Sequence, residues 1–465
     1  MIIVAAAVAA IACNKENVEP TNPEPAPSDG IVTFTAGFDV LGGSATRTNL
    51  AQNEVGEYTK MVWSKGDVIG VVDKNGEIQP FTTEAGGATA IFKGTATAPE
   101  RTWYAFYPYN KQASVKSATE SSFTDPELRI SIPEVQFAKK DGVSDNVTTL
   151  VGNCSVEKNS INFIHVCGFV QINAPEGCVS VTIELPDAND GITGGVATKF
   201  YKYGTYSTQT RYRSVTLVSQ EGMATGNYYI AVKPINYTGK VRITMHHKDG
   251  SVFVKEASGL SVGAGQVLPV NITGFSWAKD KEISLFTGAD EDRFPNYDNG
   301  YQCKIAKVSD ETMVGIKSMS WAFTEEISSE WAGYLSLYGN AVDLTDYQND
   351  YALEYYIKCT QAAVTTCGVD NEFIQHVYNG DKADREYIIM SRRYPHDTYF
   401  GLADTGWHRI SLPIKDVISA IGEAKMFKFA LKPFGKSVAA IQSYKGAEFY
   451  INNLRIVRIT PTEKE

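Results

Sequence analysis

Between about residues 31 and 147, the chain is a series of short runs in which apolar and polar residues alternate. Ile31–Phe38 and Val68–Val72 are two of these runs, and Gly, Pro or Asn interrupts the series about every eight to twelve positions. A period of two places successive side chains on opposite faces of an extended chain, which is typical of half-buried strands. Strands at this spacing predict a β-sandwich or a β-barrel.

One connection in this series has the sequence of a hairpin. Asp73–Gly76 contains an Asn-Gly pair, and a tight hairpin turn needs positive φ at both central positions, which these residues adopt at low cost. The alternating pattern then continues from about residue 150 to residue 275. The strands that we expect there are 161–172, 179–185, 228–232, 241–245 and 267–272. Cys167 lies in an apolar run within the first of them and is predicted to be a small buried hydrophobe.

A polar stretch, Trp277–Glu282, marks a boundary before a third β region. Tyr351–Lys358 and His408–Ile414 alternate strictly, and Phe427, Phe429 and Leu431 repeat the pattern. Only residues 416–422 are predicted to form a helical turn.

The last apolar run of the chain changes parity. In residues 449–456 the apolar positions switch faces between Ile451 and Leu454, which predicts a β-bulge at Asn452-Asn453. Among the large aromatic residues, Trp321 and Phe323 alternate on a predicted strand and are expected in the core.

The size and charge of the chain limit the classes of protein to which it can belong. It has 465 residues, enough for several domains, with 43% hydrophobic and 21% charged residues, which is ordinary globular composition. The formal net charge of −10 gives no long-range attraction for a phosphate backbone, so no nucleic-acid partner is expected.

The N-terminus has the pattern of an exported lipoprotein. Residues 1–12 are wholly apolar, too short to span a bilayer, and Cys13 follows at once, which resembles the lipobox of bacterial lipoproteins. Residues 13–30 are rich in Pro and acidic residues and predict an extended tether. Asn14–Glu16 resembles the signal that sends Bacteroidetes lipoproteins to the cell surface. We therefore expect a signal peptide over 1–12 and a lipid on Cys13 that anchors the protein at the outer membrane.

A set of motifs in a fixed order resembles the fimbrillin-like families of Bacteroidetes surface proteins. These motifs are Thr46–Thr48, Val62–Ile69, Ala90–Gly94, Tyr104–Tyr109, Ile161–Phe169, Tyr229–Pro234 and Leu260–Leu268. The resemblance implies two tandem transthyretin-like sandwiches, over 31–147 and 148–276, that act in adhesion or pilus assembly without catalysis. It also makes Trp63 and Trp103 structural residues, expected in the core.

The C-terminal region resembles a different family. Trp407–Ile414, followed by Phe449–Ile456, is similar to the closing strands of galactose-binding-like jelly rolls, the fold of many carbohydrate-binding modules. The resemblance implies a jelly roll over 280–465. The predicted fold class is therefore all-β: two fimbrillin-like sandwiches followed by a jelly roll.

The catalytic motifs that we considered are incomplete in this sequence. Gly435–Ser437 lacks the first glycine of a phosphate-binding loop, and His246 and His247 are neighbours on a predicted strand, so they face opposite ways. With 53 acidic residues, no sequence argument selects the carboxylate pair of a glycosidase. We expect no catalytic residues and no enzyme, and a glycoside hydrolase is the minor alternative.

One acidic cluster is a candidate metal site. Asp290, Asp292 and Asp298 lie in the turn-rich entry to the third region, and Ca²⁺ takes six to eight oxygen ligands. The hypothesis is a structural Ca²⁺, and the alternative is a solvated acidic loop. No other cofactor is expected.

Aromatic residues in loops give the clearest binding signal. Sugars present flat apolar C–H faces edged by hydroxyls, so their sites pair Trp or Tyr rings with polar side chains. Two loops of the third region have this composition, although the alternative for each aromatic residue is the core. The candidate glycan-binding residues are Trp331, Tyr334, Arg392, Arg393, Tyr394, His396 and Tyr399.

Together these patterns predict a surface lipoprotein of the outer membrane. The fimbrillin-like domains would form a stalk, and the jelly roll would bind a polysaccharide or a host glycan. The alternative function is an accessory or tip subunit of a surface fimbria that acts in cell adhesion through contacts with other surface proteins.

Overall fold

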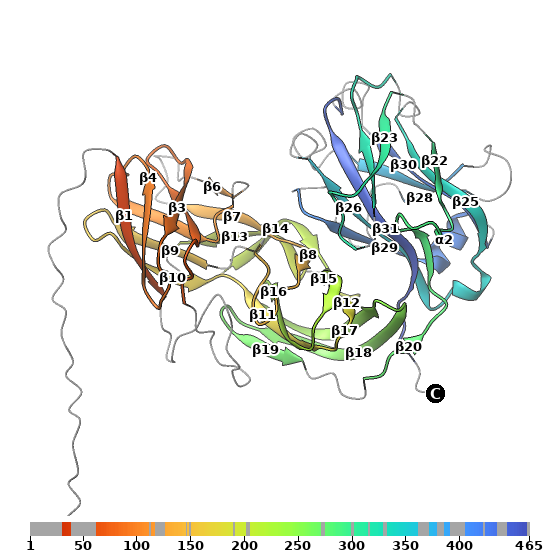
Figure 1. The fold of residues 1–465 in the computed structure, drawn as a ribbon, viewed down its shortest axis with the longest axis horizontal. Helices are drawn as coiled ribbons and strands as arrows, with labels where there is room; N and C mark the ends of the chain where they lie inside the picture. Colours follow the sequence, from red (N-terminus) through yellow and green to blue (C-terminus); the bar gives the residue numbers. More distant parts are fainter. Residues whose placement is uncertain are drawn as a thin grey trace, which may run out of the picture.

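The computed structural model describes residues 30–38, 62–110, 113–116, 126–145, 147, 150–188, 191–200, 205–270, 275–298, 302–314, 317–328, 333–360, 372–378, 386–390, 405–421, 424–434 and 444–462. Strands dominate these residues (Figure 1), which confirms the all-β prediction. Helical structure in this part of the chain is confined to η1 (Thr345–Tyr347) and α2 (Ile414–Ile421), close to the helical turn predicted over 416–422. No helix among these residues is both long and apolar enough to cross a membrane.

The first unit is a closed barrel with the strand order β1-β10-β9-β5-β2-β3-β4. Its strands are β1 (Ile31–Phe38), β2 (Val68–Val72), β3 (Ile78–Thr83), β4 (Ala90–Thr95), β5 (Thr102–Tyr107), β9 (Leu150–Ser155) and β10 (Ser160–His165). Trp63 and Trp103 are 1% and 2% exposed in its core, which confirms their predicted burial. Asp73 closes the predicted β2–β3 hairpin, because its Oδ1 accepts hydrogen bonds from the amides of Asn75 and Glu77.

Strands are shared across residue 147, where the sequence suggested a boundary. β9 and β10 follow that position and complete the barrel, and β1 pairs with β10 in parallel. β7 (Glu127–Ile132) precedes it and lies in a sheet of order β14-β13-β7-β6. The other strands of that sheet are β6 (Ser114–Lys116), β13 (Thr193–Lys199) and β14 (Thr205–Tyr212). One hydrophobic cluster joins residues from both sides, so the two regions are interleaved and share core residues.

The second unit consists of two sheets with a hydrophobic cluster between them. The six-stranded sheet has the order β20-β18-β17-β12-β15-β8, and the three-stranded sheet has the order β16-β11-β19. The strands are β8 (Val135–Phe137), β11 (Gly168–Ala174), β12 (Cys178–Glu184), β15 (Ser214–Met223), β16 (Gly226–Val232), β17 (Ile235–His247), β18 (Ser251–Val262), β19 (Val267–Val270) and β20 (Ala278–Lys279). The strand predicted over 161–172 is in fact two strands, β10 and β11, and Cys167 between them is fully buried as predicted.

The C-terminal unit is a β-sandwich over residues 280–462. Its six-stranded sheet has the order β23-β24-β31-β26-β29, with β21 paired to β31, and its five-stranded sheet has the order β22-β25-β30-β27-β28. The strands are β21 (Ile283–Phe286), β22 (Asn296–Asp298), β23 (Lys304–Val308), β24 (Ser318–Ala322), β25 (Leu335–Asp343), β26 (Tyr351–Cys359), β27 (Glu372–Tyr378), β28 (Glu386–Met390), β29 (His408–Pro413), β30 (Lys425–Phe434) and β31 (Glu448–Arg458). Trp321 and Phe323 lie in the core between the sheets, as predicted.

The register of these strands tests the sequence pattern closely. Glu354 of β26 pairs with Arg455 and Tyr356 pairs with Asn452, so two residues of β31 oppose one residue of β26. The bulge therefore consists of Asn453 and Leu454 opposite Tyr355, one position beyond the predicted Asn452-Asn453. The prediction for Phe427 was wrong: Met426 takes the core position instead, opposite Val342, beyond a register irregularity between Tyr338 and Val342 of β25.

Candidate glycan-binding face

The two outer faces of the C-terminal sandwich have different surroundings. The six-stranded sheet lies against the second unit, where Arg409 of β29 is 3.6 Å from Glu184 of β12. The five-stranded sheet, with β22, β25 and β30, lies on the side away from the second unit (Figure 1). The second unit therefore lies against the outer face of the six-stranded sheet and not against that of the five-stranded sheet, where Asp298 and Lys428 are partly exposed and Ser336 is buried.

Three strands bring a group of polar and aromatic side chains together on that face. Ser336 of β25 pairs in register with Asp298 of β22 and Ala430 of β30, and Tyr338 of β25 pairs with Lys428 of β30. Directly opposite residues in an antiparallel pair share a face. Alternation along each strand then places Ser336, Tyr338, Asp298 and Lys428 on the side opposite to the core residues Leu335, Leu337, Phe429 and Leu431.

Hydrogen bonds and charges hold this group in place. Ser336 Oγ donates to Asp298 Oδ2 at 2.9 Å, and Lys428 Nζ is 3.5 Å from the same oxygen. Lys428 Nζ also lies 5.5 Å from the ring centroid of Tyr334, the residue before β25. The Asp298 side chain is 40% exposed and the Lys428 side chain 23%, so solvent reaches both.

Tyr338, whose phenol is near Asp298, completes the group. The negative charge of Asp298, with a smaller contribution from burial, raises the pKa of Tyr338 above its usual value, so the phenol keeps its proton at neutral pH. Tyrosine rings beside an aspartate and a lysine can stack on the C–H face of a sugar and exchange hydrogen bonds with its hydroxyls. We call Asp298, Tyr334, Ser336, Tyr338 and Lys428 the tyrosine cluster.

The structure places only some of the predicted glycan-binding residues. Tyr334 belongs to the tyrosine cluster, together with Asp298, which was predicted as a metal ligand. The other six candidates, Trp331, Arg392, Arg393, Tyr394, His396 and Tyr399, lie outside the described residues. Sequence reasoning missed Tyr338 and Lys428. The spacing of Tyr334, Ser336 and Tyr338, which is that of one strand face, is the signal that could have found Tyr338.

The three candidate calcium ligands have separate surroundings. Asp292 is buried, and its carboxylate accepts hydrogen bonds from the amides of Thr287 and Gly288, each at 2.8 Å, and from the Thr287 hydroxyl at 2.9 Å. Asp290 lies in an exposed turn, and Asp298 faces Ser336. Across the described residues, no three His, Cys, Asp or Glu side chains are grouped so as to hold a metal ion. The three aspartates therefore do not share one ligand set in the described residues, and the calcium site stays a prediction.

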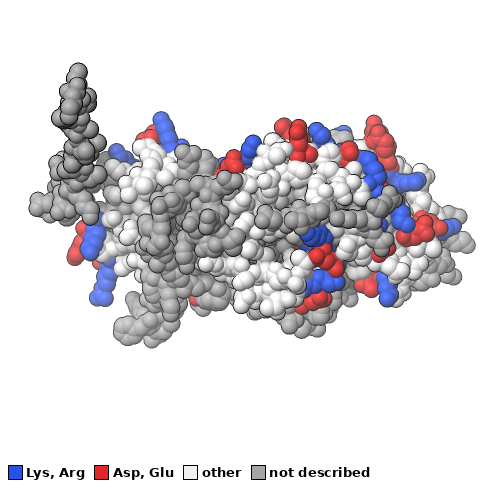
Figure 2. Space-filling model, turned by 90° about the horizontal axis from the view of Figure 1, so that it is seen from below, with Lys and Arg blue, Asp and Glu red and all other residues white. Residues whose placement is uncertain are grey.

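Charged side chains on another face are mixed in sign. Figure 2 shows Lys and Arg next to Asp and Glu in several places on the face that it draws. Among the described residues on this face, the charges do not form a continuous basic stripe of the kind that follows a nucleic-acid backbone.

The comparison with family models concerns the same part of the chain. Residues 280–458 match the model of carbohydrate binding domain 30. The match covers the C-terminal sandwich, including the tyrosine cluster, and leaves the first two units unmatched. A match to a family of binding domains favours binding over catalysis for this sandwich. A search of curated proteins gave no significant match.

Several solved structures resemble the chain at low similarity. A putative cell adhesion protein from Bacteroides uniformis is 14% identical, covers 50% of this chain and 90% of its own length, and has a TM-score of 0.26. SGBP-B from a xyloglucan utilization locus of Bacteroides uniformis is 11% identical, with coverages of 75% and 98% and a TM-score of 0.28. The tandem CBM22 domains of Paenibacillus barcinonensis Xyn10C are 10% identical, with coverages of 85% and 99% and a TM-score of 0.24.

Proposed function

We propose that this protein binds a polysaccharide through the tyrosine cluster on the outer face of its five-stranded sheet. The observation that carries the proposal is the arrangement of Tyr334 and Tyr338 around Asp298 and Lys428, within a region that matches a carbohydrate-binding family. Asp298 and Lys428 offset each other's charge, so the cluster offers hydrogen bonds and ring faces without a strong net field. That chemistry suits an uncharged sugar chain.

The test is a comparison of polysaccharide binding with thermal stability in the full chain. Tyr334→Ala and Tyr338→Ala should each weaken binding about 5- to 150-fold, as expected for loss of one stacking ring, with little change in melting temperature. Tyr347→Ala is the matched control, because Tyr347 belongs to the same sandwich but lies beside Lys281, where its hydroxyl donates to the Lys281 carbonyl. Unchanged binding in both cluster variants, measured on gels containing polysaccharide, would place the site elsewhere.

We further propose that the protein is anchored at the outer membrane by a lipid on Cys13 and that residues 13–30 and the fimbrillin-like units hold the sandwich away from the membrane. The apolar residues 1–12, the small residues before Cys13 and the Pro-rich tether support this proposal. Cys13→Ser should release the protein into the soluble fraction and abolish the incorporation of labelled fatty acid. A Ser variant that stays in the membrane, beside a wild type that takes up no label, would refute the anchor.

A further inference from the structure

The second unit and the C-terminal sandwich meet along an extended interface. On one side is the outer face of the six-stranded sheet of the second unit, and on the other is the outer face of β26, β29 and β31. Polar side chains that would face solvent in an isolated sheet are covered here: Thr182, Thr216 and Glu354 are each at most 4% exposed. The interface has three zones, at one end, in the middle and at the other end.

An apolar cluster occupies the first zone. Val135 and Val218 of the second unit pack with Met313, Tyr356 and Trp407 of the sandwich, and all five residues are at most 5% exposed. Next to this cluster the Gln220 side chain donates to the Thr312 carbonyl at 3.1 Å. This zone supplies the burial of apolar area that stabilises contacts between domains.

Arg409 occupies the middle zone. Its Nε donates to Glu354 Oε2 at 2.6 Å within the sandwich, and its Nη1 lies 3.6 Å from Glu184 Oε2 across the interface. Glu184 is also held by Arg242 of its own sheet at 3.2 Å. The Arg409 amide donates to Glu134 Oε2 at 3.0 Å, and because β29 is the last strand of its sheet, this bond covers an otherwise open edge.

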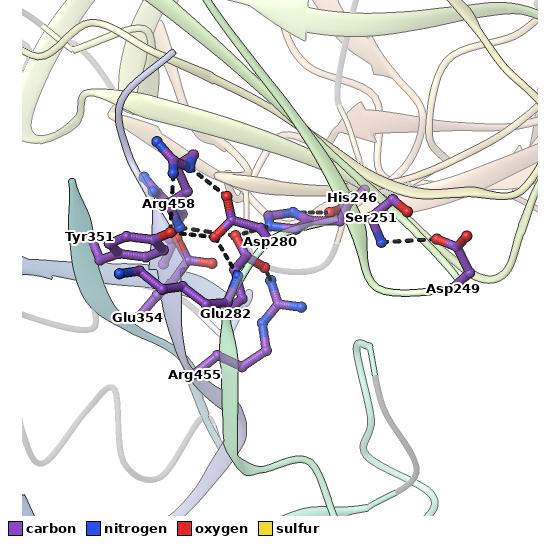
Figure 3. Close-up of polar contacts among 12 residues, drawn as sticks. His246, Asp249, Ser251, Asp280, Glu282, Tyr351, Glu354, Arg455 and Arg458 are labelled. Carbon is purple, nitrogen blue, oxygen red and sulfur yellow. Dashed lines mark hydrogen bonds and ion pairs between the residues drawn. The ribbon is translucent and has the colours of Figure 1, made fainter. Parts of the chain in front are cut away.

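The third zone lies where the chain enters the sandwich (Figure 3). His246 Nε2 of β17 is 3.2 Å from Glu282 Oε1, and the same oxygen accepts the amide of Arg458 at 2.9 Å. Asp280 receives the Arg458 Nε at 2.5 Å and the Tyr351 hydroxyl. These contacts fasten the linker to β17 on one side and to β26 and β31 on the other.

From these three zones we infer that the second unit and the C-terminal sandwich form one rigid, cooperative body. Domains in one chain usually move relative to each other, unless their interface is large and apolar. Here a rotation about any one zone would separate the other two, which would expose the apolar cluster of the first zone and break the contacts of Arg409 with Glu184 and of His246 with Glu282. The outer face of β26, β29 and β31 is thus the surface that recognises the second unit. This inference does not depend on glycan binding; if the proposed function also holds, the tyrosine cluster has a fixed orientation on the stalk.

Hydrogen exchange in the full chain tests the inference. The amides of Arg409 and Arg458 each donate to a glutamate of the interface, in different zones, so peptides that contain them report on the two zones separately. In a rigid body, Glu184→Gln weakens the middle zone and should speed exchange in both peptides by a similar factor, about tenfold or more. Glu84→Gln is the control, because Glu84 lies in the first unit with a side chain that is 85% exposed, and it should change neither peptide.

A faster exchange at Arg409 alone, with Arg458 unchanged, would show independent local contacts and overturn the inference. So would calorimetry of the wild type that resolves separate transitions for the second unit and the sandwich. Polysaccharide binding by the same variants separates this result from the proposed function, because neither substituted residue belongs to the tyrosine cluster. Retained binding with uncoupled exchange would refute the rigid body and leave the binding face intact.

Discussion

The carboxylate of Glu134 accepts the backbone amide of Arg409, which lies 275 positions later in the chain, at 3.0 Å. Its other oxygen accepts the Ser214 hydroxyl at 2.5 Å, and His408 Nδ1 is 3.8 Å away. Glu134 is only 3% exposed, so these partners replace water almost completely. One carboxyl group therefore joins the turn after β7, the strand β15 and the edge strand β29.

This burial gives the interface a predictable pH dependence. Burial raises the pKa of Glu134 to about 7, although His408, Ser214 and Arg409 act in the opposite direction. A folded-state pKa above the unfolded value means that the folded protein binds the proton more tightly. The stabilisation from Glu134 is then full below about pH 4.5 and is lost as the pH rises to about 7.

We expect Glu134→Gln, a mimic of the protonated group, to remove this dependence. As the pH rises from 5 to 8, the wild type should lose up to about 3 kcal/mol of its free energy of unfolding through Glu134. The variant should not show this loss. Urea denaturation at both pH values measures the difference. Glu84→Gln is the control, because that carboxylate is 85% exposed. Parallel pH profiles for Glu134→Gln and wild type would mean that burial does not raise the pKa of Glu134.

Glu282 should show the opposite dependence. Burial alone would raise its pKa, but His246 and Arg455 outweigh burial and lower the pKa to about 2. A folded-state pKa below the unfolded value contributes stability above about pH 4.5, which is lost as the pH falls towards 2. Glu282→Gln should therefore destabilise the chain at pH 7 by about 3 kcal/mol and flatten the acid side of the stability profile.

The comparison for Glu282 is an ion pair at the surface. Asp145 is 2.7 Å from Lys139 but is 85% exposed, so Asp145→Asn should change stability by less than about 1 kcal/mol. Equal effects of Glu282→Gln and Asp145→Asn on the denaturation midpoint would mean that the buried pair at the linker adds nothing beyond a surface ion pair.

Sequence patterns predicted the strands well and their partners poorly. Alternation identified β26 and its inward residues Leu353, Tyr355 and Ile357, because a core face leaves a periodic record in the sequence. The same alternation placed Glu354 outward, which is correct, but nothing local shows that another sheet covers it. The sharing of strands across residue 147 was missed for the same reason, since pairing partners far apart in the chain leave no local signal.

The candidate site was predictable to a similar degree. Tyr334 was found because aromatic residues in loops fit the core less well. Lys428 could not be found, because its approach to Asp298 depends on the register of β25 and β30. Tyr338 lies opposite Lys428, and the strand pattern of β30 alone gives no sign of which residues of β25 it faces.

The bulge in β31 predicts a specific substitution effect. Asn453 has φ of 53°, a left-handed conformation that asparagine and glycine adopt more easily than other residues, and it is buried. Asn453→Ala should lower the free energy of unfolding by about 1 kcal/mol or more, whereas Asn453→Gly should be tolerated better. Thermal melts of the two variants measure the difference, and an alanine variant more stable than the glycine variant would show that backbone conformation does not decide the cost.

Asp292 either closes its turn by accepting hydrogen bonds or also binds calcium, and a substitution distinguishes the two roles. If Asp292 only closes the turn, its carboxylate accepts hydrogen bonds from two amides and one hydroxyl. Asp292→Ala should then lower the free energy of unfolding by about 1–3 kcal/mol, whether calcium or a chelator is present. As a calcium ligand, Asp292 would make the melting temperature of the wild type fall on chelation, and the variant would lose that response. Because the oxygens of Asp292 already serve the turn, we expect the wild type to melt at the same temperature with calcium and with chelator. A chelator-induced drop that Asp292→Ala abolishes would instead establish the metal site.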